Sequence, residues 1–244
     1  GTITGAENGV EIGGAAAAAE FNDVTVTSPT NAGLSVTGSV SSSFDGLNVT
    51  GGNYGIVAGA GSSGSLGLTN VNISGTSLAG VYYIKDLAGD LEGTITGSAG
   101  AGIKFGSATS RDISWTGMDL SANAVGIDAG GSGKITLMDS DFGNGKDFII
   151  GGSSTVDFVE GTMDTSSVEV TGSGILNRMR QIDISVEADS SAVSGANVVL
   201  KNAAGAITGS SVTDSSGNTV SATQLVTCLL YTSDAADEED SVDL

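Results

Sequence analysis

Residues 31–52 read NAGLSVTGSVSSSFDGLNVTGG, and this order of residue types recurs along most of the chain. An aliphatic residue, Leu34, follows a glycine, and a second apolar residue, Val36, lies two positions further on. Phe44 comes next, and the turn former Gly46 follows it. Apolar and polar residues then alternate again in Leu47-Asn48-Val49. A period of two is typical of a strand with one buried face. The segment therefore predicts two or three short strands that are joined by tight corners.

Three columns of apolar residues repeat this order at intervals of 20 to 25 residues. The first column contains Val10, Leu34, Ile56, Val81, Ile103, Ile127, Phe148 and Val168, six of which directly follow a glycine. The second column contains Ile12, Val36, Ala58, Tyr83, Phe105, Ala129, Ile150 and Val170. The third column contains Phe21, Phe44, Leu68, Leu91, Trp115, Met138 and Val159, each followed two positions later by a turn former. A unit this short can bury its apolar face only by stacking on its neighbours.

A repeat of this length with Gly, Asn and Asp at its corners predicts one coil of a parallel β-helix. Each coil would lie about 4.8 Å above the last, so that equivalent residues stack. We expect Trp115 to point inward between Leu91 and Met138. We also expect amide hydrogen bonds among the asparagines that precede the first strand, namely Asn8, Asn31, Asn53 and Asn123. A left-handed hexapeptide helix, a leucine-rich repeat and a propeller are disfavoured, because their periods are absent.

The corner motif Asn-x-x-Gly before an aliphatic strand resembles the right-handed parallel β-helix superfamily, which includes pectate-lyase-like proteins. The resemblance covers residues 1–178. It implies an all-β fold, a right-handed parallel β-helix solenoid of about eight rungs, in agreement with the handedness rule for parallel crossovers. The motif is specific for this architecture and does not indicate an activity.

The repeat stops near residue 178, and a different segment, residues 179–227, follows. Its pattern resembles carboxypeptidase regulatory-like domains, which are small β-sandwiches appended to surface proteins. The residues that carry the resemblance are Val193-Ser194-Gly195-Ala196-Asn197-Val198, Gly205 and Thr213-Asp214-Ser215-Ser216-Gly217. The resemblance implies a partial β-sandwich with a spacer role, and a generic turn-rich hairpin is the alternative.

Residues 228–244 differ again, because they hold the only cysteine, Cys228, and six acidic residues. The stretch CLLYTSDAADE is similar to the translation of an adapter used in transposase-based sequencing libraries, and the final Ser241-Val242-Asp243-Leu244 fits the continuation of that adapter. We therefore expect a non-native, adapter-encoded tail that begins after Thr227. Because the chain starts at Gly1 without Met, we also expect it to be part of a longer protein.

The net charge of −20, from 28 acidic and 8 basic residues, argues against nucleic-acid and anionic-membrane partners. No apolar run approaches the roughly 18 residues of a membrane span, so we expect no membrane insertion. Histidine is absent, which excludes a Ser-His catalytic triad and the histidine-bearing motif of polygalacturonase-like members of the superfamily.

The outward column of the first strand supplies the candidate surface residues Tyr82, Lys104 and Asp128. Lys104 and Asp128 fall on adjacent rungs and predict a weak surface ion pair, with a catalytic role as the alternative. Tyr82 could bind carbohydrate together with Val57 and Ile149. Glycoside hydrolysis needs two nearby carboxylates, and no two acids occupy adjacent rungs of this column.

Two further motifs offer candidate sites. Asp139, Asp141, Asn144 and Asp147 resemble a calcium loop but lack EF-hand spacing, so calcium is the one cofactor that we consider and a solvated turn is the alternative. The sequons that begin at Asn48 and Asn72 occupy equivalent places on adjacent rungs, and predict glycosylation sites in an exported protein. Chance occurrence is the alternative for both sequons.

These features predict a non-enzymatic structural or adhesive repeat module of a large exported, extracellular or cell-surface protein. Polysaccharides or other cell-surface components would be its partners. The alternative is a carbohydrate-active or carbohydrate-binding β-helix, similar to polysaccharide lyases and hydrolases, whose active rungs lie outside this segment.

Overall fold

The computed structural model describes residues 1–14, 18–107, 109–110, 112–180, 184–201 and 204–219, and the backbone of 226–232. The fold is nearly all-β, and the only helical element in these ranges is the short 3-10 helix η1 (Thr165–Ser167). None of these ranges contains a helix that is long and apolar enough to span a membrane. The chain divides into two compact units, one built mainly from Gly1–Leu176 and the other from Asn177–Leu230.

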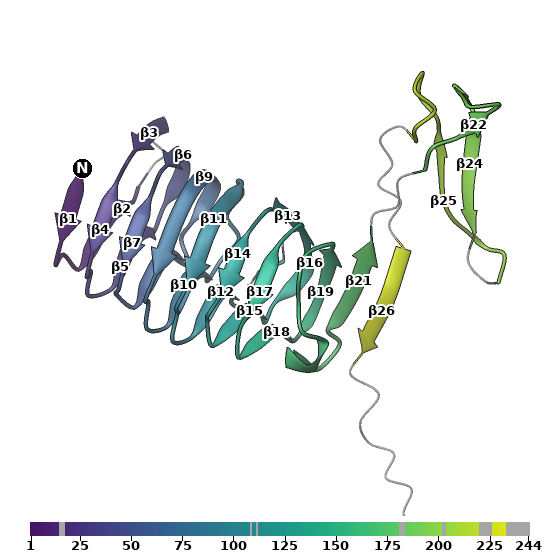
Figure 1. Ribbon diagram of the computed structural model, residues 1–244. Helices are drawn as coiled ribbons and strands as arrows, with labels where there is room; N and C mark the ends of the chain where they lie inside the picture. Colours follow the sequence, from purple (N-terminus) through teal and green to yellow (C-terminus); the bar gives the residue numbers. More distant parts are fainter. Residues whose placement is uncertain are drawn as a thin grey trace, which may run out of the picture. The chain divides into compact units, whose positions relative to one another are not determined.

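The first unit is a parallel β-solenoid of about eight turns, as the sequence predicts (Figure 1). One strand of each turn belongs to an eight-stranded parallel sheet, which we call the first sheet. Its strands, in stacking order, are β2 (Asn8–Ile12), β5 (Ala32–Val36), β8 (Tyr54–Ala58), β10 (Ala79–Tyr83), β12 (Ala101–Phe105), β15 (Val125–Ala129), β18 (Lys146–Ile150) and β20 (Val168–Val170).

Two other sheets complete the turns. The second sheet stacks β1 (Thr2–Thr4), β4 (Thr25–Thr27), β7 (Asn48–Thr50), β9 (Ser63–Ser74), β11 (Leu91–Thr96), β14 (Asp119–Ser121) and β17 (Asp141–Gly143), with a branch of β3 (Ala18–Asn22) and β6 (Ser39–Asp45). The third sheet contains β13 (Ile113–Thr116), β16 (Ser132–Met138), β19 (Ser153–Val159), β21 (Ile175–Arg180) and β26 (Val226–Thr232). The long strand β9 pairs with β6 through its first half and with β7 through its second half.

The strand register confirms the first two predicted columns along their whole length. Val10 pairs with Leu34, and the same alignment continues through every rung to Phe148 and Val168. The second column runs parallel to it, two residues along each strand, and ends with Ile150 paired to Val170. The inward residues of both columns are buried from the second rung to the seventh, so these two columns form much of the core.

The register confirms the third column from Phe21 to Leu91. Trp115 lies on β13 of the third sheet, whereas Leu91 lies on β11 of the second, and the prediction is wrong by one residue in the two rungs after Trp115. Trp115 pairs in register with Leu137, which pairs with Phe158, instead of with Met138 and Val159. The reason lies at the corner, because a residue with a left-handed backbone lies two positions after each observed column residue, namely Trp115, Leu137 and Phe158. These corner residues are Gly117 (φ 69°), Asp139 (φ 48°) and Glu160 (φ 56°), so the later corners begin before Ser140 and Gly161.

The predicted asparagine contacts at the first corner are only partly present. Asn31 Nδ2 donates a hydrogen bond to Asn8 Oδ1 at 2.9 Å, which confirms one amide pair. Asn53 Oδ1 accepts from the hydroxyl of Ser77 instead, at 2.9 Å. Asn123 is buried and donates to the backbone carbonyl of Ile95 at 2.8 Å. The corner is thus stabilised by polar side chains in several rungs, but not by one continuous amide ladder.

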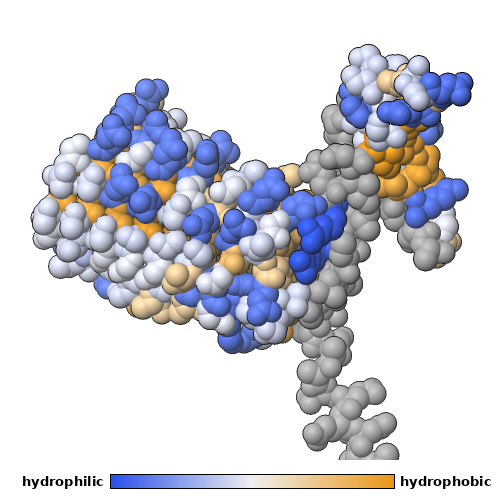
Figure 2. Space-filling view, in the orientation of Figure 1, coloured by the Kyte–Doolittle hydropathy of each residue, from blue (hydrophilic) through white to orange (hydrophobic). Residues whose placement is uncertain are grey.

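The second unit consists of short antiparallel strands. β22 (Glu187–Ala188) pairs with β23 (Ser191–Ala192), and β24 (Asn197–Lys201) pairs with β25 (Ile207–Val212). Large apolar side chains remain exposed, with Val199 at 39%, Ile207 at 67% and Val212 at 52%, and Figure 2 shows apolar residues grouped on the surface of this unit. β26 crosses the boundary that the sequence suggests after Thr227, and residues 233–244 of the expected adapter-encoded tail lie outside the described residues.

Candidate functional site

The outer face of the first sheet brings three of the predicted surface residues together. Tyr82 lies in register between Val57 and Lys104, on strands β8, β10 and β12. Lys104 in turn pairs with Asp128, which pairs with Ile149. The column therefore places an aromatic, a basic and an acidic side chain on three successive rungs, about 4.8 Å apart.

Lys104 and Asp128 form the predicted ion pair. Lys104 Nζ donates a hydrogen bond to Asp128 Oδ2 at 2.7 Å, and the two side chains are 43% and 25% exposed. The hydrogen bond to Asp128 raises the pKa of Lys104; partial burial opposes this effect, and the carboxylate charge and the phenols of Tyr82 and Tyr54 add to it. Stabilisation by this pair is therefore present below the ordinary lysine pKa and is lost as the pH rises through the raised value. Because the pair lies at the surface and is partly exposed to solvent, its contribution to stability is small.

Tyr54 stacks on Tyr82 and enlarges the aromatic surface. The ring centroids lie 5.6 Å apart, and the planes differ by 27°. Tyr54 opens β8, and its register partners on the adjacent rungs are the fully buried Ala32 and Ala79, whereas Tyr54 is partly exposed. Sequence reasoning missed Tyr54 because it lies upstream of the repeated columns, and because its register partners are alanines, so that no repeated pattern marked it.

The four predicted calcium-loop residues mostly contact other protein groups. Asp147 is 1% exposed, and its carboxylate accepts hydrogen bonds from the backbone N–H groups of Asn144 (3.2 Å) and Asp164 (2.7 Å). Asp141 accepts a hydrogen bond from Thr162 at 2.7 Å, while Asp139 forms a corner. The structure thus brings Asn144 and Asp147 together, whereas Asp139 lies at a corner and Asp141 binds Thr162. Across the described ranges, no three Asp, Glu, His or Cys side chains are grouped in a way that would hold a metal ion.

The two sequon asparagines are neighbours on the second sheet. Asn48 on β7 pairs in register with Asn72 on β9. Thr25 and Thr94 occupy the same outward position on the flanking rungs. Asn48 Nδ2 donates to the carbonyl of Gly46 at 3.1 Å, while Asn72 is exposed. Both side chains therefore belong to a column of polar residues on the outer surface.

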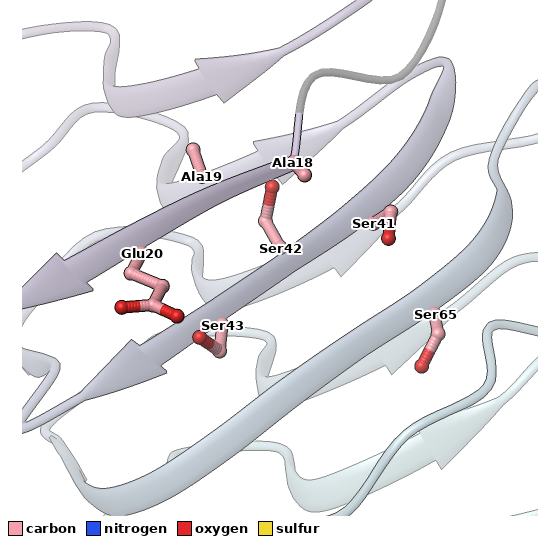
Figure 3. A pocket seen from close by; sticks show the side chains of 7 residues that line it. All are labelled: Ala18, Ala19, Glu20, Ser41, Ser42, Ser43 and Ser65. Carbon is pink, nitrogen blue, oxygen red and sulfur yellow. The ribbon is translucent and has the colours of Figure 1, made fainter.

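A shallow groove of about 540 Å³ crosses strands β3, β6 and β9 (Figure 3). Its walls carry serine hydroxyls from Ser41, Ser42, Ser43 and Ser65, and Glu20 supplies the one carboxylate among its lining residues. Glu20 pairs in register with Ser43, and Figure 3 shows its side chain directed toward that residue. A single carboxylate beside hydroxyl groups can hydrogen-bond a polar ligand, but it does not provide the acid and base of a glycosidase.

A second hollow of about 510 Å³ lies where the second sheet gives way to the third, between β11 and β13. Asp90 and Glu92 are exposed at its rim, and Trp115 contributes to its floor. The indole N–H of Trp115 is buried and has no hydrogen-bond partner. Sequence reasoning missed this hollow, because it arises from a change of strand pairing and not from a motif. Two carboxylates beside a hollow are the residue types used in glycoside hydrolysis.

No protein-family model, curated protein or solved structure matches the chain. Its architecture therefore rests on strand register and burial, and a functional proposal has to rest on the chemistry of its surfaces. The best developed candidate site is the outer face around Tyr54, Tyr82 and the Lys104–Asp128 pair, because it combines aromatic, apolar and charged groups.

Proposed function

We propose that the solenoid is a non-enzymatic structural or adhesive module of a larger exported, cell-surface protein, and that it binds polysaccharide. The observation that carries the proposal is the stacked pair Tyr54 and Tyr82 beside the Lys104–Asp128 ion pair. Aromatic rings offer apolar surface to the C–H faces of sugar rings. The adjacent charged groups offer a donor and an acceptor for sugar hydroxyls, which a binding site needs in order to fix orientation.

The net negative charge of the chain favours neutral polysaccharides over anionic ones as partners. A net charge of −20 repels polyanions over the range of the Debye length. Lys104 does not provide a local positive surface, because Asp128 neutralises it at 2.7 Å. The proposed partner is therefore a neutral polysaccharide in preference to pectate or alginate.

We expect Tyr54→Ala and Tyr82→Ala each to weaken polysaccharide binding roughly three- to tenfold, the loss that corresponds to one aromatic contact. Affinity electrophoresis through gels that contain a neutral glucan, pectate or alginate would measure this. Thr136→Ala, on the outward side of β16, is the matched control and should migrate as the unsubstituted protein does. If the double tyrosine variant folds and is retained as strongly as the unsubstituted protein, this face is not the binding surface.

The second candidate, a carbohydrate-active enzyme, is favoured by Asp90 and Glu92 at the hollow between β11 and β13. Under the proposed function we expect no release of reducing ends from pectic, alginate or glucan polymers, with or without calcium. Reproducible release of reducing ends would show that the chain is a carbohydrate-active enzyme and would contradict the non-enzymatic proposal. Loss of that release in Asp90→Asn or Glu92→Gln would assign it to the hollow, and loss in Lys104→Ala or Asp128→Ala would assign it to the first sheet.

A further inference from the structure

The outer face of the second sheet carries an ordered array of polar side chains. In each rung, an inward aliphatic residue stands between two outward residues, as in Thr2-Ile3-Thr4, Thr25-Val26-Thr27 and Thr94-Ile95-Thr96. β7 and the end of β9 carry the same pattern, with asparagine in the first position and Thr50 or Ser74 in the third. We call the ten outward residues of these five rungs the threonine array.

Strand register aligns the array into two straight columns. One column runs from Thr2 to Thr94, and the other runs from Thr4 to Thr96. Adjacent parallel strands lie about 4.8 Å apart, and residues two apart along a strand are separated by about 6.6 Å. The array is therefore a two-dimensional lattice with these two spacings, repeated over five rungs.

The corners keep this lattice regular. A residue with a left-handed backbone follows the array strand in every rung, as Gly5 (φ 65°), Ser28 (φ 50°), Gly51 (φ 77°), Gly75 (φ 66°) and Gly97 (φ 66°). The N–H groups of the first four continue the ladder to the next rung, with N···O distances of 3.1, 2.8, 2.9 and 3.2 Å. The middle residue of each array strand from Val26 to Ile95 is buried and at most 1% exposed. The backbone under the array is therefore fixed on both sides.

The threonine and serine side chains of the array direct their hydrogen-bonding capacity outward, whereas Asn48 donates a hydrogen bond to the carbonyl of Gly46. In the described part of the chain, none of the threonine and serine hydroxyls of the array has a protein partner. None of the ten array residues is charged, although the same sheet carries the exposed acids Glu20, Asp45 and Glu92 outside the array. The first sheet differs, because its outer face carries the ion pairs Lys104–Asp128 and Lys146–Glu169.

We propose that the threonine array binds ice. A ligand uses all positions of a two-dimensional lattice only if the ligand itself repeats in two dimensions, as a crystal surface does. The faces of an ice crystal repeat in two dimensions over distances of a few ångströms, as the array does, so that waters held by the hydroxyls can join the crystal lattice. Threonine suits this role, because its hydroxyl binds water while its methyl group limits competing hydration. The absence of charge from the array acts in the same direction, since charged groups hold their own hydration shells.

A crystalline polysaccharide is the other solid with a regular surface, but the array lacks the groups that favour it. Binding to the flat faces of sugar rings relies on aromatic side chains. The aromatic residues Tyr54 and Tyr82 lie on the first sheet, and none belongs to the array. The ice proposal is thus independent of polysaccharide binding by the first sheet.

The test is the partition of the purified chain between ice and liquid while a seeded solution freezes slowly. The protein should be made in a host without N-glycosylation, because glycans on Asn48 and Asn72 would cover the array. We expect the chain to be enriched in the ice, and we expect this enrichment to be lost in the double variant Thr27→Lys, Thr50→Lys. Thr136→Lys, on the third sheet, should remain enriched, and circular dichroism should show that both variants are folded.

A second variant keeps the test decisive if the lysine variant does not fold. Asn48→Thr with Asn72→Thr makes the array more regular and should increase the fraction of protein in the ice. Exclusion of the unsubstituted chain from ice would overturn the proposal, as would undiminished enrichment of the folded lysine variant. Binding to microcrystalline cellulose or chitin that is lost in the lysine variant, together with exclusion from ice, would assign the array to crystalline polysaccharide instead.

Discussion

Replacing Trp115 with alanine is expected to lower the free energy of unfolding of the solenoid by about 3–5 kcal/mol. Trp115 is 4% exposed, and its ring stacks against Tyr83 and Phe105 with centroids 6.2 and 6.1 Å away. Its register partner on the next rung is Leu137, which is fully buried. The parallel ladder fixes the spacing of the rungs, so the neighbours cannot close the cavity that the substitution leaves.

Urea unfolding followed by circular dichroism would measure this loss, and the emission of the single tryptophan would report its burial directly. Trp115→Phe should cost less than Trp115→Ala, because it keeps the ring stack and removes a buried N–H that has no partner. Tyr82→Ala is the control, since Tyr82 stacks on Tyr54 at the outer face and is not part of the buried core. A water-like emission maximum in the folded protein, or equal losses for Trp115→Ala and Tyr82→Ala, would contradict the inward position of Trp115.

The sequence predicted most of the solenoid because its geometry repeats. The first two columns follow from a strand period of two and a rung period of 20 to 25 residues, and both are visible without any knowledge of contacts. The third column failed after Trp115 because the corner, and not the strand, decides which residue points inward. Ser140 and Gly161 are typical turn-forming residues, but the left-handed residue two positions after the inward residue is Asp139 in one rung and Glu160 in the next. Residue type alone did not locate these two corners.

The candidate surfaces were predictable to different degrees. Lys104 and Asp128 were predicted because they occupy the same column on adjacent rungs, and residues in that arrangement lie next to each other. Tyr54 was missed because alanine occupies its position on the neighbouring rungs, so no pattern marked it. The hollow beside Trp115 depends on where one sheet ends and another begins, which the spacing of residues does not encode. The sequon at Asn48, by contrast, resembles a modification signal although its three residues also fit the rung pattern of the threonine array.

The glycines before the first column have a structural explanation that the sequence pattern did not supply. A Cβ atom on Gly33 would lie 2.4 Å from Val49 Cγ2, and one on Gly55 would lie 2.4 Å from Ile73 Cγ2. The opposing residue belongs to the second sheet of the same solenoid in both cases. Because glycine has no side chain, Gly33 and Gly55 on the first sheet leave space for the buried residues of the threonine-array strands, Val49 and Ile73. The recurrent glycine is a packing requirement between two sheets.

Gly80 makes this requirement testable, because a Cβ atom there would lie 2.1 Å from Ile95 Cγ2 and 2.6 Å from the carbonyl oxygen of Gly102. We expect Gly80→Val to lower the free energy of unfolding by about 3 kcal/mol, the upper part of the range for overpacked cores. Reduced entropy of the unfolded chain would offset only about 0.4–1 kcal/mol of this loss. Gly143→Ala is the matched control, since the nearest atom to its Cβ would be Ser121 Cβ at 3.9 Å, and it should change stability by less than about 0.5 kcal/mol.

A double-mutant cycle would assign the loss at Gly80 to its contact with the second sheet. Ile95→Ala removes the atom that a Cβ at Gly80 would meet first, so Gly80→Ala should cost less in the Ile95→Ala background than in the unsubstituted chain. The rescue should be incomplete, because the carbonyl of Gly102 belongs to the backbone and cannot be removed. Urea unfolding of the four proteins gives the coupling energy. Zero coupling between Gly80→Ala and Ile95→Ala would contradict the close packing of the first and second sheets at this rung. Unfolding of Gly80→Val and Gly143→Ala at the same urea concentration would contradict it as well.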